Sequence, residues 1–179
     1  QLIEFTGRPN ADTVTYSASF TNDGWHLVSN PYAAAISLSD FIDLNSTTTD
    51  AIYIWDDNGS DTGRGSSSDY IVANKSGATD NSGTNNESRW NGYIGSMQGF
   101  FIQMDGSSGE IVFAETMRVS GENGDGNYFR QLSQSFPKVR VNLTHTEGLF
   151  KQALVVWNNE VEDEQISDGY DARVFSNSA

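Results

Sequence analysis

Hydrophobic residues occur along the chain in short runs that alternate with polar residues, which is the period of two expected of β-strands. The first run alternates with threonine and serine, and its hydrophobic members are Val14, Tyr16, Ala18 and Phe20. Residues 25–29 predict the next strand, which ends at Pro31 because proline cannot donate to the ladder. The pattern predicts one short helix, at residues 38–44, with Ser37 or Ser39 as its cap.

The middle of the chain predicts two strands with a very long polar loop between them. The strands are residues 51–55 and 99–104, and residues 56–98 are mostly Asp, Asn, Gly, Ser and Thr. Ordinary connections run about four to six residues, so a loop of this length is predicted to be functional or disordered. The second strand is apolar without alternation, as in a strand buried on both faces, and residues 110–114 are predicted to be its hairpin partner.

Three more strands are predicted towards the C-terminus, at residues 139–143, 150–157 and 170–175. In the first of them, alternation with polar residues predicts a half-buried strand whose inner residues are Val139, Val141 and Leu143. Many short strands separated by turn signals are typical of a sandwich or a jelly roll. We therefore predict a single all-β domain over residues 1–179, an antiparallel β-sandwich or jelly roll with one long loop between two core strands.

The charge of the chain narrows the range of partners. Asp and Glu total 24 against 10 Lys and Arg, a formal net charge of −14, which argues against nucleic acid and anionic membranes because both require basic patches. The same charge disfavours polyanionic glycans unless a metal bridges them. No apolar run is long enough to span a membrane, so no membrane insertion is predicted. No signal peptide is visible at Gln1, which predicts a mature fragment or a cytosolic protein.

Several segments together resemble a domain type that is common in large secreted proteins of the Bacteroidota, where it lies near a C-terminal type IX secretion sorting domain. Their order and spacing fit, and they span nearly the whole chain. The segments are GWHLVSNPY (residues 24–32), IYIW (52–55), MQGFFI (97–102), MR with YFR (117–118 and 128–130), and VRVNL with DGYDA (139–143 and 168–172).

The resemblance implies a β-sandwich on an exported protein, at the cell surface or outside the cell, with flanking catalytic or adhesin domains. It implies no catalytic activity, because the shared motifs are of a structural kind. Gly24 is expected in a turn, together with Asn30 and Pro31, and Gly99 where two backbones approach closely. The chain departs from the family pattern at His26 and Ser29, where Asn and Gly are usual.

Catalytic chemistry has little support in the sequence. The chain has two histidines, His26 and His145, no cysteine, and no Gly-x-Ser-x-Gly motif for a serine nucleophile. Both histidines are therefore interpreted as structural. A small glycoside hydrolase is kept as a further alternative, because it requires only two carboxylates about 5–10 Å apart. The available carboxylates are Glu110, Glu115, Asp105 and Glu160.

A calcium site is predicted directly after the first of the two middle strands. Calcium binds six to eight oxygen ligands, and the candidate ligands are Asp56, Asp57, Asn58 and Asp61. The order of these residues is not that of an EF-hand. The alternative is a solvated loop that keeps an acidic protein soluble.

Carbohydrate binding requires exposed aromatic rings and a few polar side chains that bond the sugar hydroxyls. The predicted rings are Trp90, Tyr93, Tyr70 and Trp55, and the predicted polar partners are Arg89, Asn91 and Asp57. The alternative is that Trp90 and Tyr93 hold the long loop onto the sandwich. Trp25 and Trp157 lie in apolar runs and are predicted to be core residues.

Together these observations predict a non-catalytic carbohydrate-binding module of an exported Bacteroidota protein. Its role would be to hold a larger enzyme or adhesin near a polysaccharide. The alternative is a structural spacer or adhesion domain with no small ligand, stiffened by Ca²⁺.

Overall fold

A computed structural model describes residues 6–55, 70–80, 91–104, 106, 108–123, 138–144 and 150–156. The strands are β1 (Val14–Ala18), β2 (Trp25–Ser29), β3 (Ala35–Ser37), β4 (Ile52–Trp55), β5 (Tyr70–Asn74), β6 (Gly77–Asp80), β7 (Tyr93–Ile94), β8 (Gly99–Gln103), β9 (Gly109–Phe113), β10 (Arg118–Val119), β11 (Lys138–Thr144) and β12 (Phe150–Val156). The helical segments are η1 (Asn22–Gly24), α1 (Leu38–Leu44) and η3 (Glu115–Met117).

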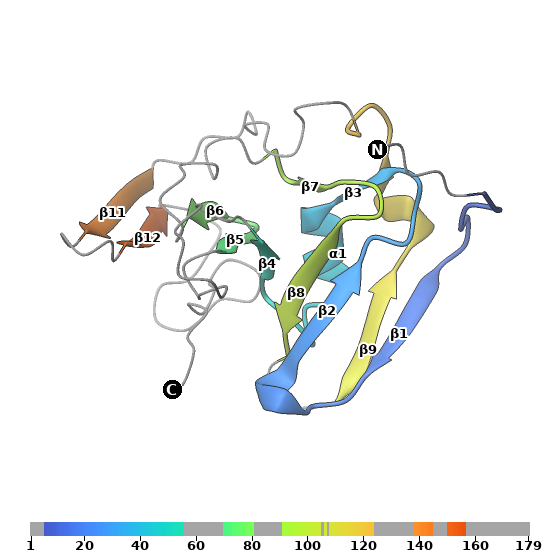
Figure 1. The fold of residues 1–179 in the computed structure, drawn as a ribbon, viewed down its shortest axis with the longest axis horizontal. Coiled ribbons are helices and arrows are strands. Elements are labelled where there is room, and N and C mark those ends of the chain that lie inside the picture. Colours follow the sequence, from blue (N-terminus) through green and yellow to red (C-terminus); the bar gives the residue numbers. More distant parts are fainter. Residues whose placement is uncertain are drawn as a thin grey trace.

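All strand pairs in the described part of the chain are antiparallel, and the prediction of an all-β sandwich is confirmed. The largest sheet has the order β2-β8-β4-β5-β6. Three smaller sheets have the orders β10-β3-β7, β1-β9 and β11-β12. Figure 1 shows β9 and β1 beside β2, with α1 behind β8. No helix among the described residues is long and apolar enough to cross a membrane.

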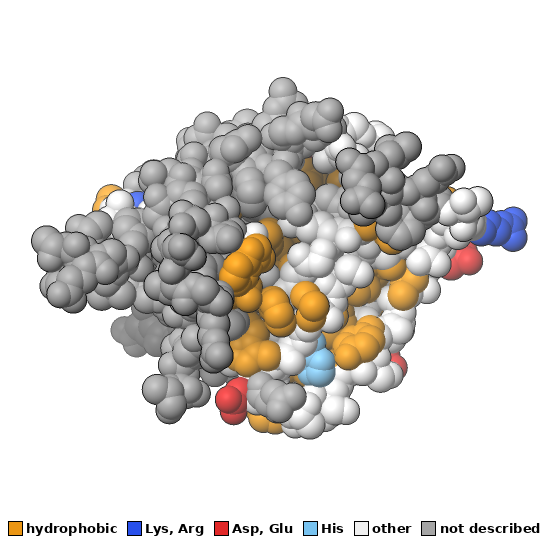
Figure 2. Space-filling model, in the orientation of Figure 1, with side chains coloured by type: hydrophobic (Ala, Val, Ile, Leu, Met, Phe, Trp, Pro, Cys, Tyr) orange, Lys and Arg blue, Asp and Glu red, His pale blue; other side chains and the backbone are white. Residues whose placement is uncertain are grey.

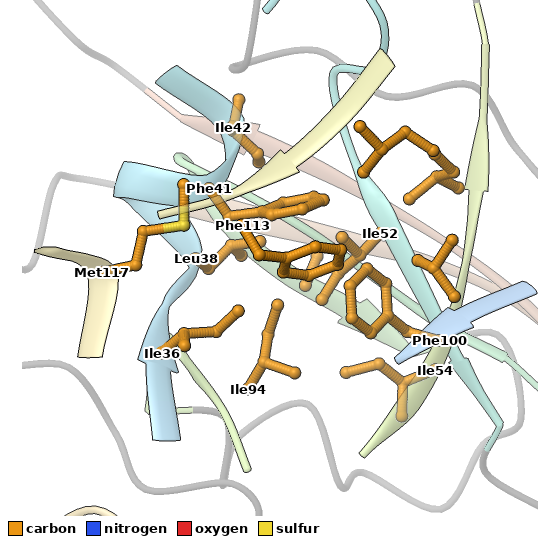
Figure 3. Packing of buried hydrophobic residues seen from close by; sticks show 14 of the residues in the cluster. Ile36, Leu38, Phe41, Ile42, Ile52, Ile54, Ile94, Phe100, Phe113 and Met117 are labelled. Atoms are coloured by element: carbon orange, nitrogen blue, oxygen red, sulfur yellow. The ribbon is translucent and has the colours of Figure 1, made fainter. Parts of the chain in front are cut away.

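The main core lies between one face of the five-stranded sheet and the smaller elements. Three rings meet at its centre: Phe41 of α1 lies 5.5 Å from Phe100 of β8 and 5.2 Å from Phe113 of β9, measured between centroids (Figure 3). Burying a side chain of this size stabilises the fold by about 1.5–3 kcal/mol. Aliphatic side chains surround the rings, and the fully buried ones are Ile36, Leu38, Ile42, Ile52, Ile54, Ile71, Ile94, Ile102 and Ile111.

Helix α1 forms where the one helix was predicted, and Ser37 is its cap. The Ser37 hydroxyl accepts a hydrogen bond from the Asp40 N–H at 3.2 Å, which satisfies a donor that the helix leaves unpaired. At the other end, the buried amide of Asn45 donates to the carbonyl oxygens of Phe41 and Val112, and its oxygen accepts from the Val112 N–H at 2.7 Å. Asn45 therefore ties the end of α1 to β9.

The expectation of one uninterrupted loop between the two middle strands is wrong. β4 and β8 are direct neighbours in the largest sheet, with Ile52 opposite Ile102. The segment between them contains β5 and β6, which extend the same sheet beyond β4, and β7, which joins the sheet of β3 and β10. These strands have two to five residues, and such short apolar runs are hard to distinguish within a polar sequence.

Three expectations about individual strands are also wrong. β9 pairs with β1 rather than with β8. β8 alternates: Phe100 and Ile102 are buried in the main core, while Phe101 is half-buried on the opposite face. Val139 and Val141 of β11 are 48% and 56% exposed, so the alternation there does not mark a buried face.

The GWHLVSNPY segment is structural at three of its positions. Gly24 has a φ of +78°, and a Cβ there would lie 2.7 Å from the Met104 carbonyl oxygen. The amide nitrogen of buried Asn30 lies 2.8–3.2 Å from the carbonyl oxygens of Ala34, Ile94 and Gly95. Tyr32 is also fully buried. By contrast, a Cβ on Gly99 would meet its nearest backbone atom only at 3.8 Å, so the expected close approach is absent there.

Gly24 is expected to be intolerant of any side chain. Gly106 also has a positive φ, +86°, but a Cβ there meets nothing within 4 Å. Gly106→Ala should lower the free energy of unfolding by about 1 kcal/mol, the cost of left-handed backbone alone. Gly24→Ala should lower it by about 3 kcal/mol, because displacing backbone in a packed site adds about 2 kcal/mol to that cost. Urea unfolding of both variants measures the difference, and equal losses would contradict the steric account.

Asn30→Asp tests the buried amide at constant shape. A carboxylate has no N–H to donate to the three carbonyl oxygens, so we expect a loss of about 3 kcal/mol or more. Burial raises the pKa of a carboxyl group, so this loss should be greater at pH 8 than at pH 5. The control is Asn10→Asp, where an exposed amide donates only to the Pro31 carbonyl. Urea unfolding at both pH values checks the prediction, and a loss equal to that of the control would count against it.

Candidate functional site

The outer face of the five-stranded sheet, opposite the main core, carries a second apolar cluster. We call it the aromatic face, and it consists of Trp25, Leu27, Tyr53, Trp55, Tyr70, Val72 and Phe101. Tyr53 and Val72 are buried at its centre, and Trp25, Tyr70 and Phe101 are half-buried around them. Trp55 is 48% exposed and Leu27 is 64% exposed. In Figure 2, hydrophobic side chains gather over β4, β8 and β2.

The aromatic face follows from the alternation of four strands. In β4, Ile52 and Ile54 point to the main core, so Tyr53 and Trp55 point outwards. The strand register then aligns the outward residues in rows across the sheet. One row consists of Leu27, Phe101, Tyr53 and Val72, each opposite the next. A second pair, Trp55 and Tyr70, lies one step further along β4 and β5.

Neighbouring rings on this face contact each other edge to face. The centroids of Trp55 and Tyr70 are 5.1 Å apart, with an angle of 83° between the ring planes. The corresponding values are 5.9 Å and 78° for Tyr70 and Phe101, and 4.8 Å and 72° for Trp25 and Tyr53. Such pairs contribute about 0.5–1.5 kcal/mol each beyond the area that they bury. The rings therefore hold one another in fixed orientations.

The structure brings together two of the predicted platform residues, Trp55 and Tyr70, and places a third elsewhere. Tyr93 is half-buried on β7, opposite Ser37 of β3, and so belongs to another sheet. Asn91 is buried; its side chain accepts from the Tyr93 N–H at 3.1 Å and donates to Glu122 at 3.3 Å. We therefore leave Tyr93 and Asn91 out of the aromatic face.

The remaining predicted site residues lie outside the residues that the structure describes. They are the platform and polar residues Trp90, Arg89 and Asp57 and the calcium ligands Asp56, Asp57, Asn58 and Asp61. In the described part of the chain, no group of three or more His, Asp or Glu side chains is placed to hold a metal ion. The calcium site thus stays a prediction from the sequence.

Sequence reasoning missed most of the aromatic face. Trp25 was predicted as a core residue, but it is half-buried and packs on Tyr53 on the outer side of the sheet. Tyr53 was hidden in a run that is apolar at every position, and Phe101 lies between apolar neighbours, so alternation gives little signal for either residue. The signal that was available is in β2, where Trp25 and Leu27 share a face with period two.

His26 contacts one backbone carbonyl and one side chain through its two ring nitrogens. Its Nε2 lies 3.0 Å from the Ser19 carbonyl oxygen, and its Nδ1 lies 3.5 Å from the Tyr16 hydroxyl. Neither neighbour is a nucleophile with an orienting partner of the kind that base catalysis requires. The other histidine, His145, lies outside the described residues.

Glu115, one of the carboxylates kept for a hydrolase, is a hydrogen-bond acceptor in a loop contact. The Thr13 hydroxyl donates to it at 2.7 Å, and this bond is the main reason that the pKa of Glu115 is lowered. A general acid of a glycosidase needs the opposite, a raised pKa. The contact therefore favours a structural role for Glu115, holding the residues before β1 against those after β9.

Thr13→Val should raise the pKa of Glu115 towards its ordinary value, because valine keeps the shape and removes the donor. The folded-state pKa lies below the unfolded one, so this group stabilises the fold above its unfolded pKa. That stabilisation is lost as the pH falls through the folded pKa. An NMR titration of the Glu115 carboxyl carbon measures the shift, with Thr15→Val, at an exposed position of β1, as the control. An identical titration in Thr13→Val and the native chain would contradict the assignment.

The fold and the aromatic face define an antiparallel β-sandwich domain with one partly exposed apolar sheet face. The sequence matches the model of a family described as a domain of unknown function, DUF8693, over residues 2–179, and the chain belongs to this family. Comparison with curated proteins and with solved structures found no significant match.

Proposed function

We propose that this domain is a non-catalytic carbohydrate-binding module of an exported protein, and that the aromatic face is its binding surface. The observation that carries the proposal is the position of Trp55. This ring is 48% exposed, and it is held edge to face by Tyr70. A large exposed ring in a fixed orientation is what the apolar C–H face of a sugar requires for stacking.

Polar groups beside the rings support the same function. Ser29 is exposed on β2, and because it comes two residues after Leu27 it lies on the same face of the sheet. Gln103 is half-buried opposite Trp25, and its amide nitrogen donates to the Asp23 carbonyl oxygen at 3.2 Å, while the amide also carries an oxygen of the kind that accepts from hydroxyl groups. Hydroxyl and amide groups of this kind orient a sugar while the ring supplies contact area.

A second function, a spacer or adhesion domain that docks onto protein, is favoured by two exposed aliphatic side chains. Leu27 is 64% exposed on the aromatic face, and Met97, in the turn before β8, is 60% exposed. Flexible methionine and branched aliphatic groups suit protein surfaces better than sugars. In this alternative, calcium bound by Asp56, Asp57, Asn58 and Asp61 would stiffen the domain.

Trp55→Ala should reduce retention of the domain on polysaccharide gels at least tenfold, because it removes the exposed ring. The expected loss of stability is about 2 kcal/mol, because the half of the ring that is buried is lost together with the contact with Tyr70. The matched control is Tyr16→Ala, which removes a ring of similar exposure, 44%, from β1 in another sheet. Affinity electrophoresis on a panel of neutral and acidic polysaccharides, with Ca²⁺ and with EDTA, measures retention.

The outcomes separate the two functions. If the Trp55→Ala variant is no longer retained while the Tyr16→Ala variant still is, the result supports carbohydrate binding at the aromatic face. Retention by both variants at the native level would place the site elsewhere, and no retention of the native domain would favour the spacer or adhesion domain. Loss of retention in EDTA would support the calcium site, since ligand binding requires the metal only if the metal shapes the site.

A further inference from the structure

We infer that the aromatic face selects one class of glycan: neutral polysaccharides presented as single, hydrated chains, rather than polyanionic or crystalline ones. This inference rests on the proposed function. It is carried by two observations that are independent of each other, the charge of the residues on this face and the angles between its rings.

The outward positions of the five strands, as far as the structure describes them, carry no charged residue. Besides the residues of the aromatic face itself, the outward positions of the five strands are Ser29, Asn74, Gly77, Thr79, Gly99 and Gln103. All of these are uncharged, although 19% of the residues in the chain are charged. A neutral ligand therefore loses no hydration of charged groups when it covers this face.

A polyanionic glycan would meet a different situation. Without a bridging metal, tight binding of uronate or sulfate groups requires Arg or Lys that pair with them. The described outward positions of the five strands offer neither, and Arg140 of β11, which borders β6, already donates to the Ala78 carbonyl oxygen at 3.1 Å. The net charge of −14 adds repulsion. Because that repulsion is screened beyond about 8 Å at physiological ionic strength, the local lack of cations is the stronger cause of exclusion.

The ring angles argue against a crystalline ligand. A flat crystal surface offers many sugar faces in one plane, so it is bound through several rings that lie in one plane. Here the ring contacts between residues that reach the surface are close to perpendicular: 83° for Trp55 and Tyr70, and 78° for Tyr70 and Phe101. Two rings in direct contact thus never present their faces to the same plane. A single chain, whose sugar units can rotate about their linkages, fits this geometry better.

The test uses polysaccharides that share a backbone and differ only in charge or order. Charge is tested by affinity electrophoresis with hydroxyethylcellulose against carboxymethylcellulose, pullulan against carboxymethyl-pullulan, and dextran against dextran sulfate. Order is tested by pull-down with acid-swollen against microcrystalline cellulose, and colloidal against crystalline chitin. We expect at least one neutral, disordered probe to retain the domain, with retention at least tenfold weaker on its charged or crystalline counterpart.

Failure of this inference differs from failure of the proposed function. Equal retention on a neutral probe and its charged counterpart, or on a disordered probe and its crystalline counterpart, overturns the inference. If Trp55→Ala still abolishes that retention while Tyr16→Ala keeps it, carbohydrate binding at the aromatic face stands. No retention of the native domain on any of these probes overturns the inference and the proposed function together.

Discussion

The register between β4 and β8, in the middle of the largest sheet, determines both the core and the aromatic face. It sets Ile52 opposite Ile102 on the inner side and Tyr53 opposite Phe101 on the outer side. Because side chains alternate with a period of two, a slip of one residue would exchange the two sets. The inner set packs against α1 and β9, whereas the outer set borders exposed rings, so only one register buries the aliphatic residues fully.

Buried asparagines hold the smaller elements in position against this sheet. Asn30, at the end of β2, bonds backbone carbonyls of β7 and its neighbour, and Asn45, at the end of α1, bonds both the donor and the acceptor of Val112 in β9. Each amide bonds backbone groups that would otherwise be buried without partners. Leaving one such group without a partner would destabilise the fold by about 1–3 kcal/mol. Hydrophobic contact is not directional, so it would let α1 and the smaller strands slide over the sheet. The hydrogen bonds of the two asparagines fix the position of these elements.

The sequence was sufficient for elements with a local signal. The period-two runs predicted β1 and β2, and the serine before residues 38–44 predicted the start of α1. Partners in the sheets could not be predicted, because β1 and β9 pair across more than 90 residues and no local pattern encodes that contact. The candidate site was predicted in part: Trp55 and Tyr70 were expected to act together. Phe101 and Tyr53 were not, because their runs are apolar on both faces.

The partly open aromatic face is easier to explain by function than by stability. An exposed tryptophan and leucine on a sheet face leave apolar area in water, which gives no stabilisation and invites association with other proteins. If the face served packing alone, burying Tyr53 and Val72 would suffice, and the rim would gain from polar residues. Instead, the rim carries rings fixed at steep angles and surrounded by uncharged side chains. These features fit the proposed binding of a neutral, flexible polysaccharide, which such a surface would distinguish from other ligands by shape and by lack of charge.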